Sequence, residues 1–174
     1  MSTNKMRKQL ARAKRVVIKV GSSTLTRDGA VRTRKFGDLA RQISSLIEDG
    51  REVVLVSSGA IAMGAARLEW DGPGDTIPKM QAAAAVGQIG LVELYQRRFA
   101  KHDRHVAQVL LTRTGLENRE RFLSARQTLC VLLNLGIDPV VNENDTVETE
   151  EIRIGDNDNL SANIVGLVVG DALI

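Results

Sequence analysis

The chain has few aromatic residues, one cysteine and no long hydrophobic run. Aromatic residues make up 3% of its 174 residues, so Val, Leu, Ile and Ala must build most of the core. The single cysteine, Cys130, excludes an internal disulfide and fits a reducing compartment, which predicts a cytoplasmic location. It lies in a helical pattern with Leu129, Leu132 and Leu133, so we interpret it as a packed thiol. No apolar stretch approaches the roughly 20 residues needed to cross a bilayer, so we expect no membrane contact.

Basic residues are concentrated at the start of the chain. Residues 1–15 contain six lysines and arginines and no acid, so the rest of the chain carries −3 within the total charge of +3. A nucleic-acid site needs basic residues gathered on one face, usually with stacking aromatic side chains, and the body of the chain shows neither. We therefore expect no nucleic-acid partner. A short transit peptide is one interpretation of residues 1–14, but a basic leader or solvated tail is preferred because a strand follows directly.

Alternating strands and helices predict an α/β fold. Strands are expected at residues 15–20, 52–57, 106–111, 140–141 and 172–174, and helices at 33–48, 60–65, 77–100, 117–135 and 159–169. The first two strands are β-branched and almost continuously apolar, as strands of buried parallel sheets are. Small residues inside the helix at 77–100 would let a neighbouring helix approach closely. The sequence therefore predicts a parallel sheet covered by helices.

Two dense polar clusters follow short apolar segments. Asn142-Glu143-Asn144-Asp145 comes after residues 138–141, and Gly155-Asp156-Asn157-Asp158-Asn159 comes after residues 151–154. In an α/β enzyme such clusters lie at the carboxyl ends of strands, where ligands bind. Carboxamides both donate and accept hydrogen bonds, so the clusters could hold a zwitterionic substrate and organise a cation. A pair of polar loops that cap helices is the alternative interpretation.

Two glycine turns also stand at the ends of predicted strands. In Lys19-Val20-Gly21-Ser22-Ser23, a lysine and free backbone N–H groups could approach phosphate, although a solvated lysine beside a turn is the common alternative. In the second turn, at residues 57–61, backbone N–H groups could hold an anion, or Ser58 could simply cap the following helix. Gly59 and Gly64 have the glycine spacing of a P-loop, but alanines follow where Lys and Ser/Thr are required, which excludes that motif.

Two other common sites find little support in the sequence. The first strand is not followed by a G-x-G-x-x-G motif, so a dinucleotide-binding Rossmann domain is excluded. His102, Asp103 and His105 could suggest a metal, but a third good ligand is missing and the segment joins a helix to a strand. We interpret these residues as a surface turn and predict no metal site built by the protein.

Taken together, these motifs resemble the glutamate 5-kinases of the amino acid kinase family. The matching segments are residues 17–26, 54–62, 110–113 and 118–126 together with the two polar clusters. The resemblance covers nearly all residues from 15 to 174. The first two segments occur across the wider family, whereas the run from Asn142 to Asp145 and residues 155–162 are more specific to the glutamate kinases.

The resemblance implies a fold and a reaction. The fold would be a three-layer α/β/α sandwich with a parallel sheet, of the amino acid kinase type. The reaction would be transfer of a phosphoryl group from ATP, carried with Mg²⁺, to the γ-carboxylate of L-glutamate, which opens proline biosynthesis. A general base is not required, because a carboxylate is already ionised at neutral pH. The family also suggests a homo-oligomer and L-proline as a candidate feedback inhibitor.

The resemblance assigns a phosphate site to the first glycine turn. Lys19 would contact the phosphates and offset charge during transfer, with Gly21 and Ser22 beside it in the cofactor site. Asp158 would orient phosphate-binding lysines, so Lys19 and Asp158 are the predicted catalytic residues. Arg153 stands where a lysine is expected, and its use in catalysis is left open.

The resemblance assigns glutamate binding to the polar clusters and the second glycine turn. Ser58, Asp145 and Asn157 match the positions that grip glutamate, whereas Asn142 and Asn144 would line or support that pocket. For Asp145 the alternative is that its side chain only caps the segment that follows it.

The resemblance also implies that the family domain continues past residue 174 into the rest of its nucleotide site. Residues 15–174 would then be the amino-acid-binding part of a C-terminally incomplete kinase domain, and we expect the 174-residue chain alone to be inactive. Two alternatives stay open. The chain could be a non-catalytic glutamate-binding or interaction module, or another family member such as an acetylglutamate, carbamate or uridylate kinase.

Overall fold

A five-stranded parallel sheet forms the centre of the molecule. The computed structural model describes residues 7, 10–27, 29–147 and 157–174. The sheet has the order β5-β6-β4-β1-β7, and each pair of neighbours is parallel. Its strands are β1 (Arg15–Val20), β4 (Glu52–Ser57), β5 (Val106–Leu111), β6 (Asp138–Glu143) and β7 (Ala172–Leu173). Two short antiparallel strands, β2 (Thr26–Arg27) and β3 (Ala30–Val31), form a separate hairpin.

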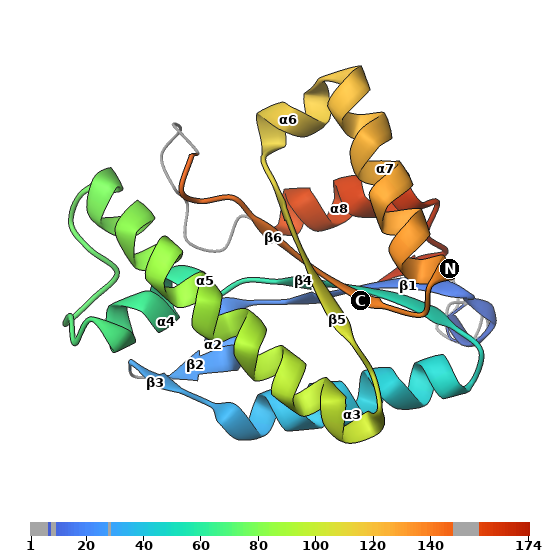
Figure 1. The fold of residues 1–174 in the computed structure, drawn as a ribbon, viewed down its shortest axis with the longest axis horizontal. Coiled ribbons are helices and arrows are strands. Elements are labelled where there is room, and N and C mark those ends of the chain that lie inside the picture. The colour runs from blue at the N-terminus through green and yellow to red at the C-terminus, as the bar shows by residue number, and fades with distance from the viewer. Residues whose placement is uncertain (1–6, 8–9, 28, 148–156) are drawn as a thin grey trace.

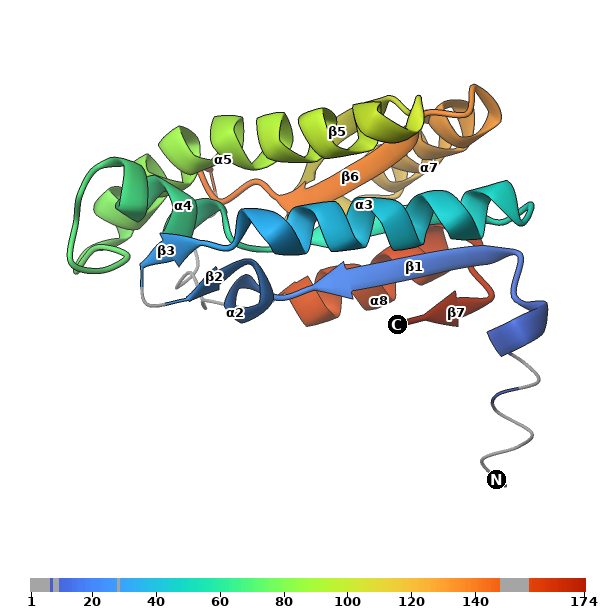
Figure 2. The same ribbon diagram turned by 90° about the horizontal axis from the view of Figure 1, so that it is seen from below.

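Helices cover both faces of this sheet (Figures 1 and 2). One face carries α3 (Thr33–Glu48), α4 (Ala60–Arg67) and α5 (Ile77–Phe99), and the other carries α6 (Arg113–Glu117), α7 (Arg119–Asn134) and α8 (Asn157–Val168). Two short elements, α2 (Ser22–Leu25) and the 3₁₀ helix η1 (Ala100–His102), also occur among the described residues. The predicted three-layer α/β/α architecture is confirmed. Among the described residues, no helix is both long enough and apolar enough to cross a membrane.

Strand β4 shows why the sheet needs two helical layers. Val53 and Leu55 belong to the core beneath α3 and α5, whereas Val54 and Val56 belong to the core beneath α7 and α8. All four side chains are at most 2% exposed. Successive residues of a strand point to opposite faces, so a strand that is apolar at every position must be covered twice. The continuous apolar runs in the sequence therefore predicted the layers correctly.

The predicted elements differ from the observed ones mainly at their ends. The strands at 15–20, 52–57 and 106–111 and the helix at 33–48 have the predicted bounds. The helix predicted at 117–135 is α7, which begins only at Arg119, because Asn118 Oδ1 accepts a hydrogen bond from the Arg121 N–H at 3.0 Å and caps the helix. The short helix α6 before it was not predicted. Strand β6 is longer than residues 140–141, because Asp138 and Pro139 already pair with β5. The apolar segment at 151–154, Arg153, Asp28, Gly155 and Asp156 lie outside the described residues.

Helices α4 and α5 pack with their backbones in close contact, as the small residues of the sequence predicted. A Cβ atom added to Gly64 would lie 1.7 Å from the Ala83 carbonyl oxygen, and one added to Gly87 would lie 1.8 Å from the Ala60 carbonyl oxygen. Both contacts are to backbone atoms, which cannot rotate away. Of the two glycines that have the spacing of a P-loop, Gly64 is thus used for helix packing.

Substituting one of these glycines should separate the two helices. We expect Gly87→Ala to lower the free energy of unfolding by about 2 kcal/mol or more, because overpacking displaces backbone as well as side chains. Gly166→Ala is the matched control: Gly166 also lies within a helix, but nothing surrounds its Cβ position within 4 Å. That control should be neutral or stabilising by up to about 1 kcal/mol. Chemical denaturation of both variants measures the difference, and equal effects would contradict the packing argument.

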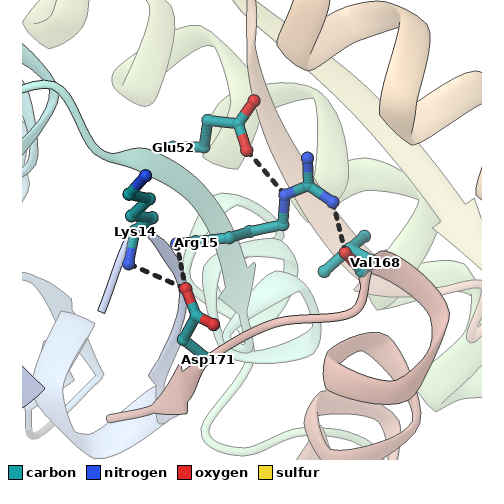
Figure 3. A network of polar contacts seen from close by, with 5 residues as sticks. All are labelled: Lys14, Arg15, Glu52, Val168 and Asp171. Atoms are coloured by element: carbon teal, nitrogen blue, oxygen red, sulfur yellow. Dashed lines mark hydrogen bonds and ion pairs between the residues drawn. The ribbon is translucent and has the colours of Figure 1, made fainter. Parts of the chain in front are cut away.

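A polar network ties strand β7 to the beginning of β1 (Figure 3). The Asp171 carboxylate accepts the backbone N–H groups of Lys14 at 2.7 Å and Arg15 at 2.9 Å. The Arg15 guanidinium donates to Glu52 at 2.6 Å and to the Val168 carbonyl oxygen at 2.5 Å. The backbone N–H groups of Arg15 and Lys14 hold the pKa of Asp171 below its usual value. The side chain of Glu52 raises the pKa of Arg15.

The Asp171 contacts predict a pH-dependent stability. A lowered pKa in the folded state means that the ionised carboxylate stabilises the fold above its ordinary pKa of about 3.9, and that this contribution is lost as the pH falls through the lowered value. Asp171→Asn should therefore melt at a lower temperature than the parent at pH 7. The difference in melting temperature between the parent and Asp171→Asn should shrink as the pH falls below about 4. Thermal melts over a pH series would measure it. A gap that is constant with pH would contradict this role for the charge.

Candidate active site at the carboxyl edge of the sheet

A cavity of about 290 Å³ lies at the carboxyl edge of the sheet. The chain segments that follow β1, β4 and β6 meet here, because parallel strands bring their carboxyl ends to one edge. The loop between α4 and α5 supplies an additional wall. The cavity is lined by Ser22, Thr26, Gly29, Ser58, Gly59, Ala60, Ile61, Ala62, Ala65, Ala66, Trp70, Asp71, Gly72, Pro73, Asn142, Glu143, Asp145 and Asn157.

The turn between β4 and α4 brings Ser58 into this cavity. Gly59 has a φ angle of 108°, in the left-handed region that glycine adopts without strain, and α4 begins at the next residue. Ser58 does not cap the helix: Gly59 is the cap residue, and no side chain makes a capping hydrogen bond there. The capping interpretation of Ser58 was therefore wrong. Its Oγ instead accepts a hydrogen bond from the Asn157 side chain at 2.9 Å.

Buried side-chain amides form the polar wall of the cavity. Nδ2 of Asn157 lies within hydrogen-bonding distance of three acceptors: the Ser57 carbonyl oxygen at 3.1 Å, Ser58 Oγ at 2.9 Å and Asn142 Oδ1 at 2.9 Å. Nδ2 of Asn142 donates in turn to Oε1 of Gln88 at 2.7 Å. Ser58, Asn142 and Asn157 are each at most 6% exposed. We call Ser58, Gln88, Asn142 and Asn157 the amide network. Three predicted substrate residues thus meet, although they come from distant parts of the sequence.

A lysine–carboxylate pair lies next to the amide network. Lys19 Nζ is 2.6 Å from Oδ1 of Asp158, and the Lys19 side chain is 24% exposed. A Cβ added to Gly21 would lie 3.5 Å from Lys19 Nζ, so the lysine folds over the glycine turn that leads to Ser22 in the cavity wall. Asn157 and Asp158 are adjacent in the first turn of α8, so this helix connects the pair to the network. Its N-terminus also favours negative charge nearby.

Of the remaining predicted residues, Asp145 and Asn144 lie at different cavities. Asp145 lines the first cavity. Asn144 lines a neighbouring cavity of about 280 Å³, together with Thr112 and Arg121. The Oδ1 atom of Asn144 accepts a hydrogen bond from Thr146 at 2.6 Å, and its backbone N–H donates to Leu111 at 2.7 Å. Direct contact of Asn144 with a ligand in the first cavity is therefore not supported by its position, and its role stays a prediction.

Sequence reasoning missed two residues that support the site. Gln88 was not among the predicted site residues, yet it is part of the amide network. Tyr95, also on α5, is fully buried, and its hydroxyl lies 2.9 Å from Ser57 Oγ beneath the second glycine turn. Burial raises the pKa of Tyr95, and the Ser57 hydrogen bond only partly opposes this, so the hydroxyl stays neutral. For both residues, the available signal in the sequence was a polar group on an otherwise apolar face of the helix.

The histidine segment has the geometry of a turn. His102 ends η1, and Asp103 has a φ angle of 54° in the connection to β5. This agrees with the interpretation as a surface turn. Within residues 10–27, 29–147 and 157–174, the structure contains no group of three or more His, Cys, Asp and Glu side chains that could hold a metal ion.

Comparison with known proteins agrees with this geometry. The amino acid kinase family model matches residues 14–174. The chain is 54% identical to the glutamate 5-kinases of Burkholderia ambifaria and Burkholderia thailandensis and 53% identical to that of Paraburkholderia phymatum, each over 170 residues. Each alignment covers 97% of this chain and 46% of the relative, so the chain spans about half the length of the curated relatives it matches. With a family match over almost its whole length, the chain belongs to the amino acid kinase family.

Proposed function

We propose that the protein transfers a phosphoryl group from ATP to the γ-carboxylate of L-glutamate, the first step of proline biosynthesis. This chain would supply the glutamate pocket and one phosphate-binding lysine. One observation carries the proposal: a buried amide network lies beside the Lys19–Asp158 pair at the carboxyl edge of a parallel sheet. The names of the relatives, which are glutamate 5-kinases, support the choice of reaction.

The cavity offers partners for both charges of an amino acid. The Ser58 hydroxyl can donate to a carboxylate, because its oxygen already accepts from Asn157. Nδ2 of Asn157 donates within the network, so Oδ1 is the atom of this side chain that could accept from an ammonium group. Asp145 lines the same cavity. The volume of about 290 Å³ suits a small substrate. We therefore assign Ser58, Asp145 and Asn157 to glutamate recognition, with Asn142 as their support.

Lys19 is suited to stabilise charge on a transferring phosphoryl group. Phosphoryl transfer depends mainly on positioning and on electrostatic stabilisation, which a partly buried cation can supply. Asp158 holds the ammonium group of Lys19 at 2.6 Å and so fixes its direction. Because Gly21 has no side chain, the backbone there could approach the oxygens of the phosphoryl group. Ser22 lines the neighbouring substrate cavity. ATP supplies the phosphoryl group, and we propose that Mg²⁺ arrives bound to its phosphates, the common arrangement for this ion.

Other features of the proposed enzyme remain predictions. A cytoplasmic location would suit a chain with a single cysteine, Cys130, which is free in the structure. Feedback by L-proline and assembly into a homo-oligomer are expectations from the family resemblance. A panel of glutamate, acetylglutamate, carbamate and uridylate, tested as phosphoryl acceptors in a protein of the relatives' full length that carries this chain, would test the choice of substrate.

Asp145 should determine how strongly glutamate binds. In such a full-length protein, we expect Asp145→Ala to raise the glutamate KM by about 30-fold or more, because losing one partner of a desolvated ion pair costs about 2–5 kcal/mol. The KM for ATP should change little. Asp145→Asn separates charge from capping, since asparagine can still cap the following segment. Steady-state kinetics that show a normal glutamate KM in Asp145→Asn would refute recognition by the carboxylate.

Lys19 should act mainly on turnover. Lys19→Ala should lower kcat by about 100-fold or more, because it removes charge stabilisation that is strongest in the transition state. The glutamate KM should stay within about threefold, since only a modest ground-state contact is lost. Lys101→Ala, in the exposed part of η1, is the matched loss of a lysine charge and should keep the parent kinetics. A Lys19→Ala enzyme with parental kcat would exclude Lys19 from the reaction.

A further inference from the structure

Gln88 is the last residue in the chain of hydrogen bonds that forms the amide network. Stability alone does not explain why a glutamine occupies this position. Its Oε1 accepts from Asn142 Nδ2 at 2.7 Å, although the two residues are 54 positions apart. Its own Nε2 is buried and has no hydrogen-bond partner among the described residues. A buried, unpaired N–H group destabilises a folded protein. Methionine has a similar length and would carry no such group, so glutamine must contribute something other than packing.

Two backbone groups fix which atom of each neighbouring amide donates. The Glu143 N–H can only donate, and it donates to Asn142 Oδ1 at 2.9 Å. The Ser57 carbonyl can only accept, and it accepts from Asn157 Nδ2 at 3.1 Å. Asn157 Nδ2 also donates to Asn142 Oδ1 at 2.9 Å, so both amides have one consistent orientation. Asn142 must therefore present Nδ2 towards α5, where Oε1 of Gln88 is the matching acceptor.

This orientation decides what the cavity offers a ligand. Because Asn157 directs Nδ2 into the network, its Oδ1 remains as an acceptor. Because Ser58 Oγ accepts from Asn157, the Ser58 hydroxyl proton remains as a donor. An ammonium group needs the acceptor and a carboxylate needs the donor. If Asn142 were reversed, two donor groups would face each other, and the arrangement of Asn157 and Ser58 would lose its support.

We propose that Gln88 is a positioning residue that fixes the donor and acceptor directions of the amino acid pocket by acting through Asn142. Gln88 does not itself line the cavity. The inference deepens the proposed function and rests on it in one respect, namely that the ligand is an α-amino acid. According to this proposal, Gln88 affects the affinity for glutamate but does not affect the binding of the ATP phosphates.

Kinetics of Gln88→Met in the full-length protein test the proposal. We expect the glutamate KM to rise about tenfold, as for one misdirected hydrogen bond to a charged group, while the ATP KM stays within about twofold. The melting temperature should stay close to that of the parent, because the variant removes the unpaired Nε2 but also leaves Asn142 Nδ2 without its acceptor. Gln96→Met, at an exposed position of the same helix, is the control and should leave all three values unchanged. An unchanged glutamate KM in Gln88→Met would overturn the proposal.

Two further variants separate positioning from a merely structural role. Gln88→Glu keeps an acceptor towards Asn142, so its glutamate KM should lie closer to the parent value than that of Gln88→Met. In an Asn142→Ala background, Gln88→Met should add nothing to the KM, because residues that act through one another are not additive. Multiplicative effects on the glutamate KM would overturn the proposal.

The failure of the proposed function can be told apart from the failure of this inference. If the parent protein does not phosphorylate or bind glutamate, the proposed function is wrong, and the inference is then tested by unfolding. Gln88→Met should stabilise the Asn142→Ala variant more than it stabilises the parent, because it leaves Asn142 Nδ2 unpaired only in the parent. Additive changes in the free energy of unfolding would show that the two amides are not coupled.

Discussion

The buried side chain of Asn157 joins the parts of the chain that make the site. Its amide contacts the strand end at Ser57, 100 residues earlier, and Asn142, 15 residues earlier. A buried amide that loses its partners destabilises the fold, so these contacts hold β4, β6 and the start of α8 in one arrangement. Ser58 and Asn157 both line the cavity, and in the proposed enzyme they would offer a ligand the Ser58 hydroxyl as a donor and Asn157 Oδ1 as an acceptor. In the proposed enzyme, the residues that satisfy these buried hydrogen bonds would also recognise the ligand.

The close packing of α4 on α5 also contributes to this arrangement, because it positions Gln88 next to Asn142. Without side chains at Gly64 and Gly87, the two helix backbones approach closely enough for the middle of α5 to reach the sheet edge. Gln88 follows Gly87 directly and meets Asn142 there. The position of one amide of the network, next to the pocket, thus depends on a contact between small residues. Substitutions at these glycines should affect the pocket as well as the stability of the fold.

The first turn of α8 contributes one residue to each of two contacts at the site. Asn157 faces the amide network, whereas the next residue, Asp158, pairs with Lys19. A kinase must hold its acceptor and its phosphate donor in a fixed relation, because in-line transfer tolerates little misplacement. Because Asn157 and Asp158 are consecutive residues of one helix turn, the two contacts are held at a fixed distance from each other. In the proposed enzyme, glutamate binding and phosphate positioning would be linked through this turn.

Much of the fold could be predicted from the sequence because its signals are local. Continuous apolar runs marked β1, β4 and β5, and helical periodicity marked α3 with its correct ends. The start of α7 was placed two residues early, because the cap at Asn118 is a side-chain hydrogen bond that helical periodicity does not report. The full length of β6 was missed because the pairing of Asp138 and Pro139 depends on a neighbouring strand. Pairing between strands is a long-range interaction that local composition does not report.

The sequence by itself determined which residue types were available for the site, and the family resemblance singled out Lys19, Ser58, Asn142 and Asn157 among them. Only the tertiary structure decided that Gln88 joins these amides, that Asn144 belongs to a neighbouring cavity, and that Ser58 accepts from Asn157 instead of capping a helix. The physical reason is that a hydrogen-bond direction depends on every partner around it. Those partners come from segments that only the folded sheet brings together.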